Sequence, residues 1–167
     1  MSNTDENLKA AFAGESQANR KYLFFAERAD KEDLRQIAKL FQAAAEAERV
    51  HARNHLNALG GIGSTKDNLK DAVSGENYEF TQMYPEFIKQ AEAEENSQAK
   101  TSFDWANQVE KIHHGLYEKA LKSLEGGEAL KDEPYFVCQG CGNTVEGEAP
   151  EKCPICGAPK SMFKRVD

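Results

Sequence analysis

Apolar side chains recur every three or four positions over the first three quarters of the chain. Four such stripes span residues 8–29, 37–58, 76–91 and 103–124. This spacing places side chains on one face of an α-helix, and each stripe is long enough for several helical turns. The pattern predicts a mainly α-helical protein built as a four-helix bundle, with helices of about 20 to 30 residues.

Glycine and proline positions predict where these helices end. Gly60-Gly61 follows the second stripe and Gly126-Gly127 follows the fourth, and glycine is favoured just after a helix C-terminus. Residues 62–75 are expected to form a loop with at most a short helical turn, so the third helix would begin near Gly75. That connection is long enough for a crossover between helix pairs. Pro85 is expected to kink the third helix, because proline lacks the backbone N–H that the helix needs.

A small tail follows the predicted bundle. Residues 126–134 are polar and bounded by glycine and proline, which is typical of a linker. We therefore predict two domains, residues 1–133 and 134–167. The second has too few apolar side chains to fold without a disulfide or a metal.

All four cysteines lie in this tail, as two Cys-x-x-Cys pairs, Cys138–Cys141 and Cys153–Cys156. Two facing pairs of this kind build a tetrahedral four-thiolate metal site. Two disulfides are the alternative in an exported protein, but the polar N-terminal residues show no export signal. We predict a metal site, and because zinc ribbons and iron-binding rubredoxins share this spacing, the spacing alone does not choose between the two metals.

Glutamate interrupts all four apolar stripes, and histidine interrupts two of them. Burying uncompensated carboxylates would cost far more than a domain's net stability of roughly 5–15 kcal/mol, whereas a polyvalent cation would remove that cost. In chain order the pattern is Glu, Glu-x-x-His, a doubled Glu, and Glu-x-x-His, as in ferritin-like di-iron and di-manganese bundles. The candidate metal ligands are Glu15, Glu48, His51, Glu76, Glu79, Glu110 and His113.

A solvated helix face is the ordinary explanation for any single Glu-x-x-His pair. Two copies on apolar stripes, with glutamate on the other two stripes, favour a dinuclear site. Carboxylate and imidazole ligands suit iron or manganese, and the donor set excludes neither. Tyr22 and Tyr84 are candidates to hydrogen-bond the ligating carboxylates, the alternative being core tyrosines whose hydroxyls bond to any available partner.

Composition and charge narrow the classes of partner. Of 167 residues, 40% are hydrophobic and 29% are charged. The longest strongly apolar run, residues 22–26, is far shorter than the roughly 20 residues that cross a bilayer. A net charge of −7 argues against nucleic acid and anionic membranes as partners. We expect a cytoplasmic protein that binds neither.

The chain resembles the rubrerythrin family over nearly its full length. The likeness rests on residues 14–29, 46–55, 75–87 and 109–113 and on the CxxCG and CPxCG motifs of the tail. The resemblance implies a ferritin-like di-iron four-helix bundle followed by a rubredoxin-like domain. The family's di-iron ligands fall on the seven candidates named above, and its single rubredoxin-type iron falls on Cys138, Cys141, Cys153 and Cys156.

The resemblance also implies a function, that of a non-haem di-iron peroxidase which reduces hydrogen peroxide to water in oxidative-stress defence. Electrons would come from a rubredoxin, or from NAD(P)H through a separate reductase, and would pass through the tail iron. The implied assembly is a head-to-tail homodimer, or a higher oligomer, in which the tail iron of one subunit lies near the di-iron site of the other. One iron would exchange Glu79 for His51 when its oxidation state changes.

Two other functions are compatible with parts of the pattern. A ferritin-like iron oxidase would use oxygen and need only the bundle, with zinc or manganese as alternative metals. A structural zinc ribbon on a helical scaffold would need only the tail, and it leaves the Glu and His residues unexplained. The additional carboxylate Glu76 and the fused tail favour peroxide.

Overall fold

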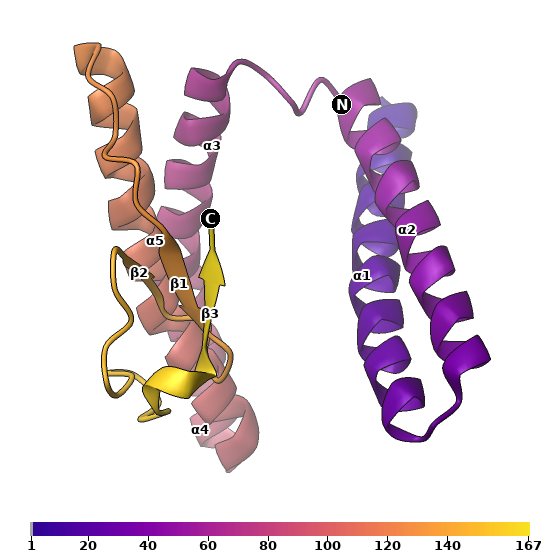
Figure 1. Ribbon diagram of the computed structural model, residues 1–167. Coiled ribbons are helices and arrows are strands. Elements are labelled where there is room, and N and C mark those ends of the chain that lie inside the picture. Colours follow the sequence, from indigo (N-terminus) through magenta and orange to yellow (C-terminus); the bar gives the residue numbers. More distant parts are fainter. Residues whose placement is uncertain (1) are drawn as a thin grey trace. The chain divides into compact units, whose positions relative to one another are not determined.

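The computed structural model describes residues 2–167 (Figure 1). The chain divides into two compact units, one ending at Gly63 and the other comprising Ser64–Asp167. Each unit contains two of the four long helical segments predicted from the sequence. The predicted boundary at residues 133 and 134 falls inside the second unit and stays a prediction. Among the described residues, no helix is both long and apolar enough to cross a membrane.

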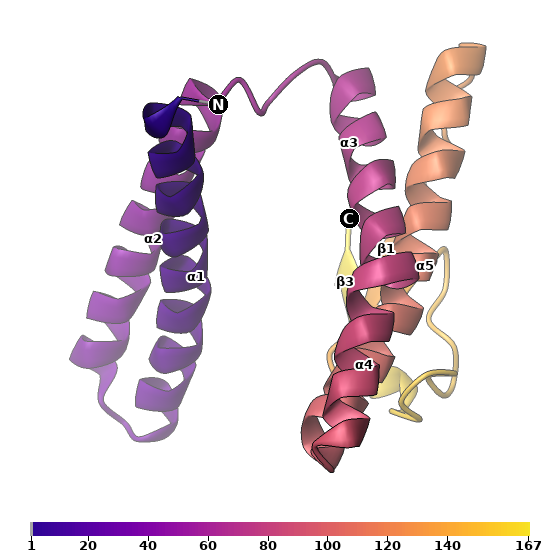
Figure 2. The same cartoon turned by 180° about the vertical axis from the view of Figure 1, so that it is seen from behind.

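The first unit is a pair of helices, α1 (Asn3–Lys31) and α2 (Arg35–Ala58), which lie side by side in both views (Figures 1 and 2). A capping box starts α1, because the Ser2 hydroxyl accepts the N–H of Asp5 while the Asp5 carboxylate accepts the N–H of Ser2. A tight turn with Asp33 at a φ of 58° reverses the chain between the helices.

The contact between α1 and α2 buries small side chains next to an aromatic cluster in which Tyr22 and Phe25 meet Phe41. The buried residues of the pair are Ala26, Ala29, Ala38, Ala45 and Ala52. On α2 these alanines lie one position beyond Ile37, Ala44 and His51 of the predicted stripe, and Ile37 is 46% exposed. The stripe that carries the candidate ligands of α2 therefore lies at the edge of this contact, where His51 is exposed and Glu48 is half-buried.

The helices of the second unit are α3 (Thr65–Tyr78), α4 (Tyr84–Ala93) and α5 (Ser97–Gly126). The prediction of a loop as far as Gly75 is wrong, because α3 already begins at Thr65. Ser64 caps this helix by accepting the N–H of Asp67. Leu69, Ala72 and Val73 then continue a short apolar face at helical spacing, which is too sparse to stand out in the sequence.

A π-helical turn, η1 (Glu79–Met83), joins α3 to α4. The N–H of Tyr84 bonds to the carbonyl of Glu79, five residues back. Pro85 follows in the first turn of α4, where its missing N–H is tolerated. The irregularity predicted at Pro85 thus occurs as a π turn directly before it, and such turns are frequent at functional sites.

The tail is a small antiparallel sheet of β1 (Tyr135–Cys138), β2 (Thr144–Glu146) and β3 (Phe163–Val166), in the order β2-β1-β3. A 3-10 turn, η2 (Lys160–Met162), precedes β3. The first Cys-x-x-Cys pair has Cys138 at the end of β1 and Cys141 in the loop between β1 and β2. Pairing of Val137 with Thr144 closes this loop.

The tail lies against α5 of its own chain, within the second unit (Figure 1). Lys119 of α5 forms an ion pair with Glu146 of β2 at 2.7 Å. Gly142 lies next to the buried Val109: a Cβ at this glycine would be in ordinary van der Waals contact with the Val109 side chain, at 3.8 Å. β2 and the loop before it therefore rest on one face of α5.

Candidate metal centres

Three predicted ligands of the first unit come together: Glu15 from α1 and Glu48 and His51 from α2. One ligand atom of each lies within 4.8 Å of the others. The His51 Nδ1 is 2.9 Å from Glu48 Oε2 and 3.9 Å from Glu15 Oε1. The Glu48 side chain is 19% exposed and that of His51 is 53% exposed. This cluster is an open half-site with two carboxylates and one imidazole.

A matching cluster in the second unit joins Glu76 of α3 to Glu110 and His113 of α5. The His113 Nδ1 is 2.8 Å from Glu110 Oε2 and 3.9 Å from Glu76 Oε1. The spacing of Glu110 and His113 brings both side chains to one helix face, as it does for Glu48 and His51. All three side chains are less than 30% exposed.

The carboxylates of this second cluster are crowded. Burial, a hydrogen bond with Glu110 and the negative charge of Glu110 raise the pKa of Glu76 to about 7. The hydrogen bond between Glu110 and His113 lowers the pKa of Glu110 and raises the pKa of His113. The Glu76 Oε2 atom is buried, and nothing within residues 2–167 hydrogen-bonds to it.

Glu79 and Tyr84 lie at the margin of the same cluster. Burial and the charge of Glu110 raise the pKa of Glu79, although no Glu79 oxygen falls within the tight grouping of Glu76, Glu110 and His113. Burial, followed by the charges of Glu110, Glu79 and Glu76, raises the pKa of Tyr84. Tyr84 is thus close to the carboxylates and stays protonated at neutral pH, while its hydrogen bond to a ligating carboxylate stays a prediction.

A polyvalent cation fits this arrangement. It would give the orphaned Glu76 oxygen a partner and remove the repulsion between Glu76 and Glu110. Carboxylate oxygens and an imidazole nitrogen are ligands that suit iron and manganese. The second cluster therefore has the chemistry of a metal half-site, and the first has the same three donor groups.

The four cysteines form a separate site in the tail. All are free thiols, and one sulfur from each lies within 4.8 Å of the others. The Cys138–Cys156 and Cys141–Cys153 sulfurs are each 3.6 Å apart. A tetrahedral metal with metal–sulfur distances near 2.3 Å needs sulfurs roughly 3.8 Å apart. The predicted four-thiolate site is therefore preformed for one metal ion.

Backbone and side-chain donors surround these sulfurs. Burial acts to raise the pKa of Cys153, but N–H groups of Cys156 and Ile155 and the neighbouring thiols outweigh it and lower the pKa to about 6. Asn143, only 1% exposed, donates from Nδ2 to the Cys153 sulfur at 3.7 Å. These donors favour a thiolate at Cys153, which is the form that binds metal. Burial raises the pKa of Cys141 and of Cys156, so these two thiols would lose their protons when a metal binds.

Sequence reasoning missed two polar residues at these sites. Asn143 and Thr144 escaped notice because they lie between motif positions, although their place just after Cys141 was a usable signal. Thr144 bonds through Oγ1 to the His113 Nε2 at 2.9 Å. The ring of Tyr22 packs against Phe25 and Phe41, and a hydrogen bond from its hydroxyl to a ligating carboxylate stays a prediction.

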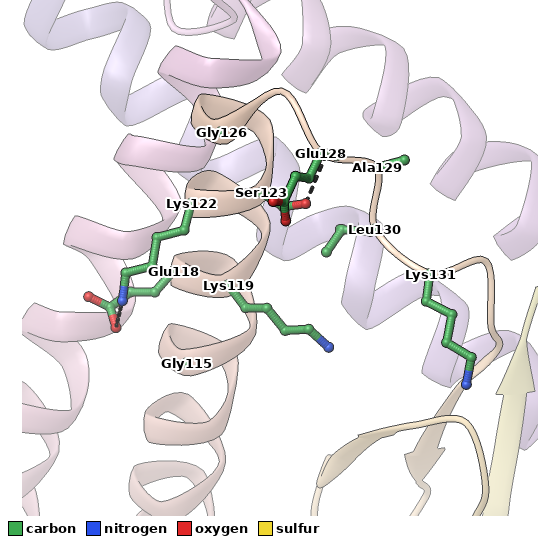
Figure 3. Close-up of a pocket in the computed structure, with 10 residues that line it drawn as sticks. All are labelled: Gly115, Glu118, Lys119, Lys122, Ser123, Gly126, Glu128, Ala129, Leu130 and Lys131. Atoms are coloured by element: carbon green, nitrogen blue, oxygen red, sulfur yellow. Dashed lines mark hydrogen bonds and ion pairs between the residues drawn. The ribbon is translucent and has the colours of Figure 1, made fainter.

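A surface hollow of about 550 Å³ lies between the end of α5 and the linker, lined by three lysines among other residues (Figure 3). Lys122 faces Glu118 at 3.8 Å and Lys131 pairs with Glu133 at 2.5 Å. Lys119 is held by Glu146 of β2. Because a carboxylate already neutralises each lysine, we do not assign a binding site to this hollow.

Comparison with known proteins places these features in a family. The rubrerythrin family model matches residues 6–121, and the model of the rubrerythrin rubredoxin-like domain matches residues 136–164. Rubrerythrin-2 of Clostridium acetobutylicum is 36% identical, with the match covering 96% of this chain and 95% of that protein. Nigerythrin of Nitratidesulfovibrio vulgaris is 37% identical, over 98% of this chain and 86% of that protein.

Solved structures of related proteins support the same family. Nigerythrin in its fully reduced, all-ferrous state aligns with a TM-score of 0.59 at 36% identity, over 99% of this chain and 88% of the other. The mixed-valent state of nigerythrin aligns with a TM-score of 0.57 over the same shares of the two chains.

The helices, the carboxylate–histidine clusters and the thiolate domain define a ferritin-like metalloprotein with a rubredoxin-like tail. The chain belongs to the rubrerythrin family. Members of this family are oxidoreductases of oxidative-stress defence, with a di-iron site of carboxylate and histidine ligands and a four-cysteine iron site. The predictions of the family, the fold class and the iron cofactors are confirmed.

Proposed function

We propose that this protein is a non-haem di-iron peroxidase, which reduces hydrogen peroxide to water with electrons passed through its four-cysteine iron. The observation that carries the proposal is the contact between two different metal sites. His113 of the carboxylate cluster is hydrogen-bonded to Thr144, three residues after the ligand Cys141. An electron-transfer centre at this place serves a redox reaction at the helices and has no part in simple iron storage.

The proposed ligands extend the observed clusters. Both carboxylate–histidine clusters and Glu79 supply ligands to the iron pair, and the four cysteines hold the third iron. The complete proposed set is Glu15, Glu48, His51, Glu76, Glu79, Glu110 and His113 for the iron pair, and Cys138, Cys141, Cys153 and Cys156 for the single iron.

When bound, the iron pair supplies the two electrons that convert one peroxide and two protons into two waters. The five glutamates provide a charge of −5, which is intermediate between the amounts needed to balance two ferrous and two ferric ions. Tyr84 stays protonated beside Glu110 and Glu79 and can donate a hydrogen bond to a ligating carboxylate. The ligand shell therefore tolerates both oxidation states without rebuilding the helices.

The cysteines have a different role. Four thiolates complete a tetrahedral shell and leave no position for peroxide. The tail therefore accepts and passes on single electrons, and burial of Cys138 and Cys153 shields two of its four sulfurs from solvent. The proposed donor is a rubredoxin, or NAD(P)H through a separate reductase, since NAD(P)H delivers the two electrons that each peroxide consumes.

We further propose that the protein works in the cytoplasm as a homodimer with head-to-tail subunits, or as a higher oligomer of such dimers. In the structure the tail contacts α5 of its own chain. A dimer in which the tail also serves a partner subunit would have to keep, or exchange, the contact between Thr144 and His113.

A steady-state comparison of oxidants tests the proposal. Protein with its irons in place is supplied with NADH, a rubredoxin and a rubredoxin reductase, and then with either hydrogen peroxide or oxygen. We expect NADH oxidation to be much faster with peroxide, in the ratio of one NADH to one peroxide. Faster consumption of oxygen, with ferric iron accumulating in solution, would instead establish a ferritin-like iron oxidase.

A further inference from the structure

The hydrogen bond between His113 and Thr144 links a metal ligand of one site to the domain of the other. The His113 Nε2 is 2.9 Å from Thr144 Oγ1. The same hydroxyl oxygen is 3.0 Å from the carbonyl oxygen of Gly142, to which it donates its hydrogen. On the other side of the ring, Nδ1 faces Glu110 at 2.8 Å and Glu76 at 3.9 Å.

Counting hydrogens decides which nitrogen of His113 carries a proton. A threonine hydroxyl has a single hydrogen, and Gly142 accepts it. Thr144 Oγ1 can then only accept a hydrogen bond from His113, so the Nε2 atom of His113 must carry the hydrogen. Nδ1 is hydrogen-bonded to Glu110 at 2.8 Å in the metal-free protein. A metal ion bound beside Glu76 and Glu110 would take the place of that hydrogen on Nδ1, while Nε2 keeps its own.

The position of Thr144 depends on the cysteine loop. Thr144 begins β2, directly after the loop that follows Cys138 and contains Cys141. The loop is closed by bonds from the Cys138 N–H to the Asn143 carbonyl and from the Gly142 N–H to the Cys138 carbonyl. The tail has too small an apolar core to hold this loop by itself. Metal bound to the cysteines therefore keeps the Thr144 hydroxyl in place.

We propose that Thr144 is a positioning residue for the helical metal site: it fixes the tautomer and orientation of His113, and through it metal bound by the four cysteines strengthens metal binding at Glu76, Glu110 and His113. The inference rests on the proposal that these three residues bind metal, and it does not depend on the oxidant. Partners that hold the second nitrogen of a ligating histidine typically contribute roughly 10- to 100-fold to metal affinity. The coupling is reciprocal, so metal at the helices also stabilises the docked tail.

Cobalt(II) binding to the full chain tests the proposal. The cysteine site is first filled with one zinc ion, and Co²⁺ is then titrated while its visible spectrum reports binding at the helices. We expect Thr144→Val to weaken Co²⁺ binding by roughly 10- to 100-fold, and Thr144→Ser to restore it. Thr101→Val is the matched control, because Thr101 lies on α5 and its hydroxyl bonds to the Ser97 carbonyl of the same helix.

A thermodynamic cycle isolates the coupling. Replacing all four cysteines by serine should weaken Co²⁺ binding at the helices by a factor similar to that of Thr144→Val. Combining the two changes should then add little further loss, because both act through one hydrogen bond. Independent, multiplicative losses would overturn the coupling.

The tautomer of His113 gives a readout that does not depend on activity. In ¹⁵N-labelled protein with zinc bound by the cysteines, long-range nitrogen–proton correlations should show Nε2 protonated. Thr144→Val should shift this pattern. An unchanged His113 spectrum together with unchanged Co²⁺ affinity would refute the role of Thr144. Failure of the unaltered chain to bind Co²⁺ at the helices would refute the proposed metal site itself.

Discussion

Asn143 is a buried polar residue at the four-cysteine site, only 1% exposed. Its amide donates to the Cys153 sulfur, and such bonds stabilise the reduced, more electron-rich centre. Asn143→Leu should therefore lower the reduction potential of the tail iron, by roughly tens of millivolts. Redox titration of the visible thiolate-to-iron absorption measures the shift.

The control for this prediction is Gln139→Leu in the same loop. The Gln139 amide bonds to the Val137 carbonyl instead of a sulfur, so we expect its removal to leave the potential unchanged. Equal potentials for the Asn143 variant and the unaltered protein would show that its amide does not act on the iron.

Glu79 and His51 are the residues for which we predict a change of ligand. Glu79 lies outside the tight cluster of its unit, and His51 is the more exposed of the two cluster histidines. His51→Ala should retain its iron when oxidised but become harder to reduce, because the ferrous state has lost its replacement ligand. Glu79→Ala should weaken the diferric form more than the diferrous one.

Iron content measured in both oxidation states, together with redox titration, distinguishes these outcomes. Loss of iron from His51→Ala to the same extent in both states would make His51 a fixed ligand. The ligand exchange would then be removed from the mechanism.

At the scale of elements, the pairing of α3 with α5 presses Glu76 against Glu110. The pKa of Glu76 rises from a usual value of 4.5 to about 7 in the folded protein, so between these values the native state holds a proton that the unfolded state has lost. Stability must then fall as pH rises through this range. The raised pKa of His113 likewise makes stability fall as pH rises above 6.5. The lowered pKa of Glu110 has the opposite effect, because it makes stability rise with pH below 4.5.

We therefore predict that protein with zinc only at the cysteines becomes less stable between about pH 5 and 7. Chemical unfolding at several pH values measures how steeply the free energy of unfolding falls with pH, and Glu76→Gln should make this slope smaller. Metal at the helices should reverse the sign of the slope, since metal competes with protons for the same groups. An undiminished slope in Glu76→Gln would assign the effect to other groups.

At the scale of the whole molecule, the two kinds of site should be separable in function. We predict three irons per chain in the intact protein. Cys138→Ser should abolish the colour of the tail and turnover with a reductase. At saturating iron, chemically reduced helices should still consume about one equivalent of peroxide in a single turnover.

Iron analysis, the visible spectrum and a single-turnover peroxide assay check this prediction together. Serine at Cys156 should behave in the same way, because its sulfur forms one edge of the tetrahedron with that of Cys138. If the single-turnover reaction also disappears, peroxide chemistry needs the tail iron directly.

The sequence by itself determined the helical periodicity, the two cysteine pairs and the chemistry of the candidate ligands. These are local properties, because spacing along one helix decides which side chains share a face. For that reason spacing alone was enough to pair Glu48 with His51, and Glu110 with His113. The start of α3 was predicted wrongly, since a polar cap at Ser64 and a sparse apolar face give only a weak signal.

Only the tertiary structure decided which residues meet across elements. Glu15 reaches Glu48 because α1 packs on α2 through alanines, and Glu76 reaches Glu110 because α3 packs on α5. Thr144 meets His113 across 31 residues of sequence, through the docking of a domain that no helical period describes. Such contacts depend on packing between distant segments, so spacing could nominate the ligands but could not identify the residue that positions one of them.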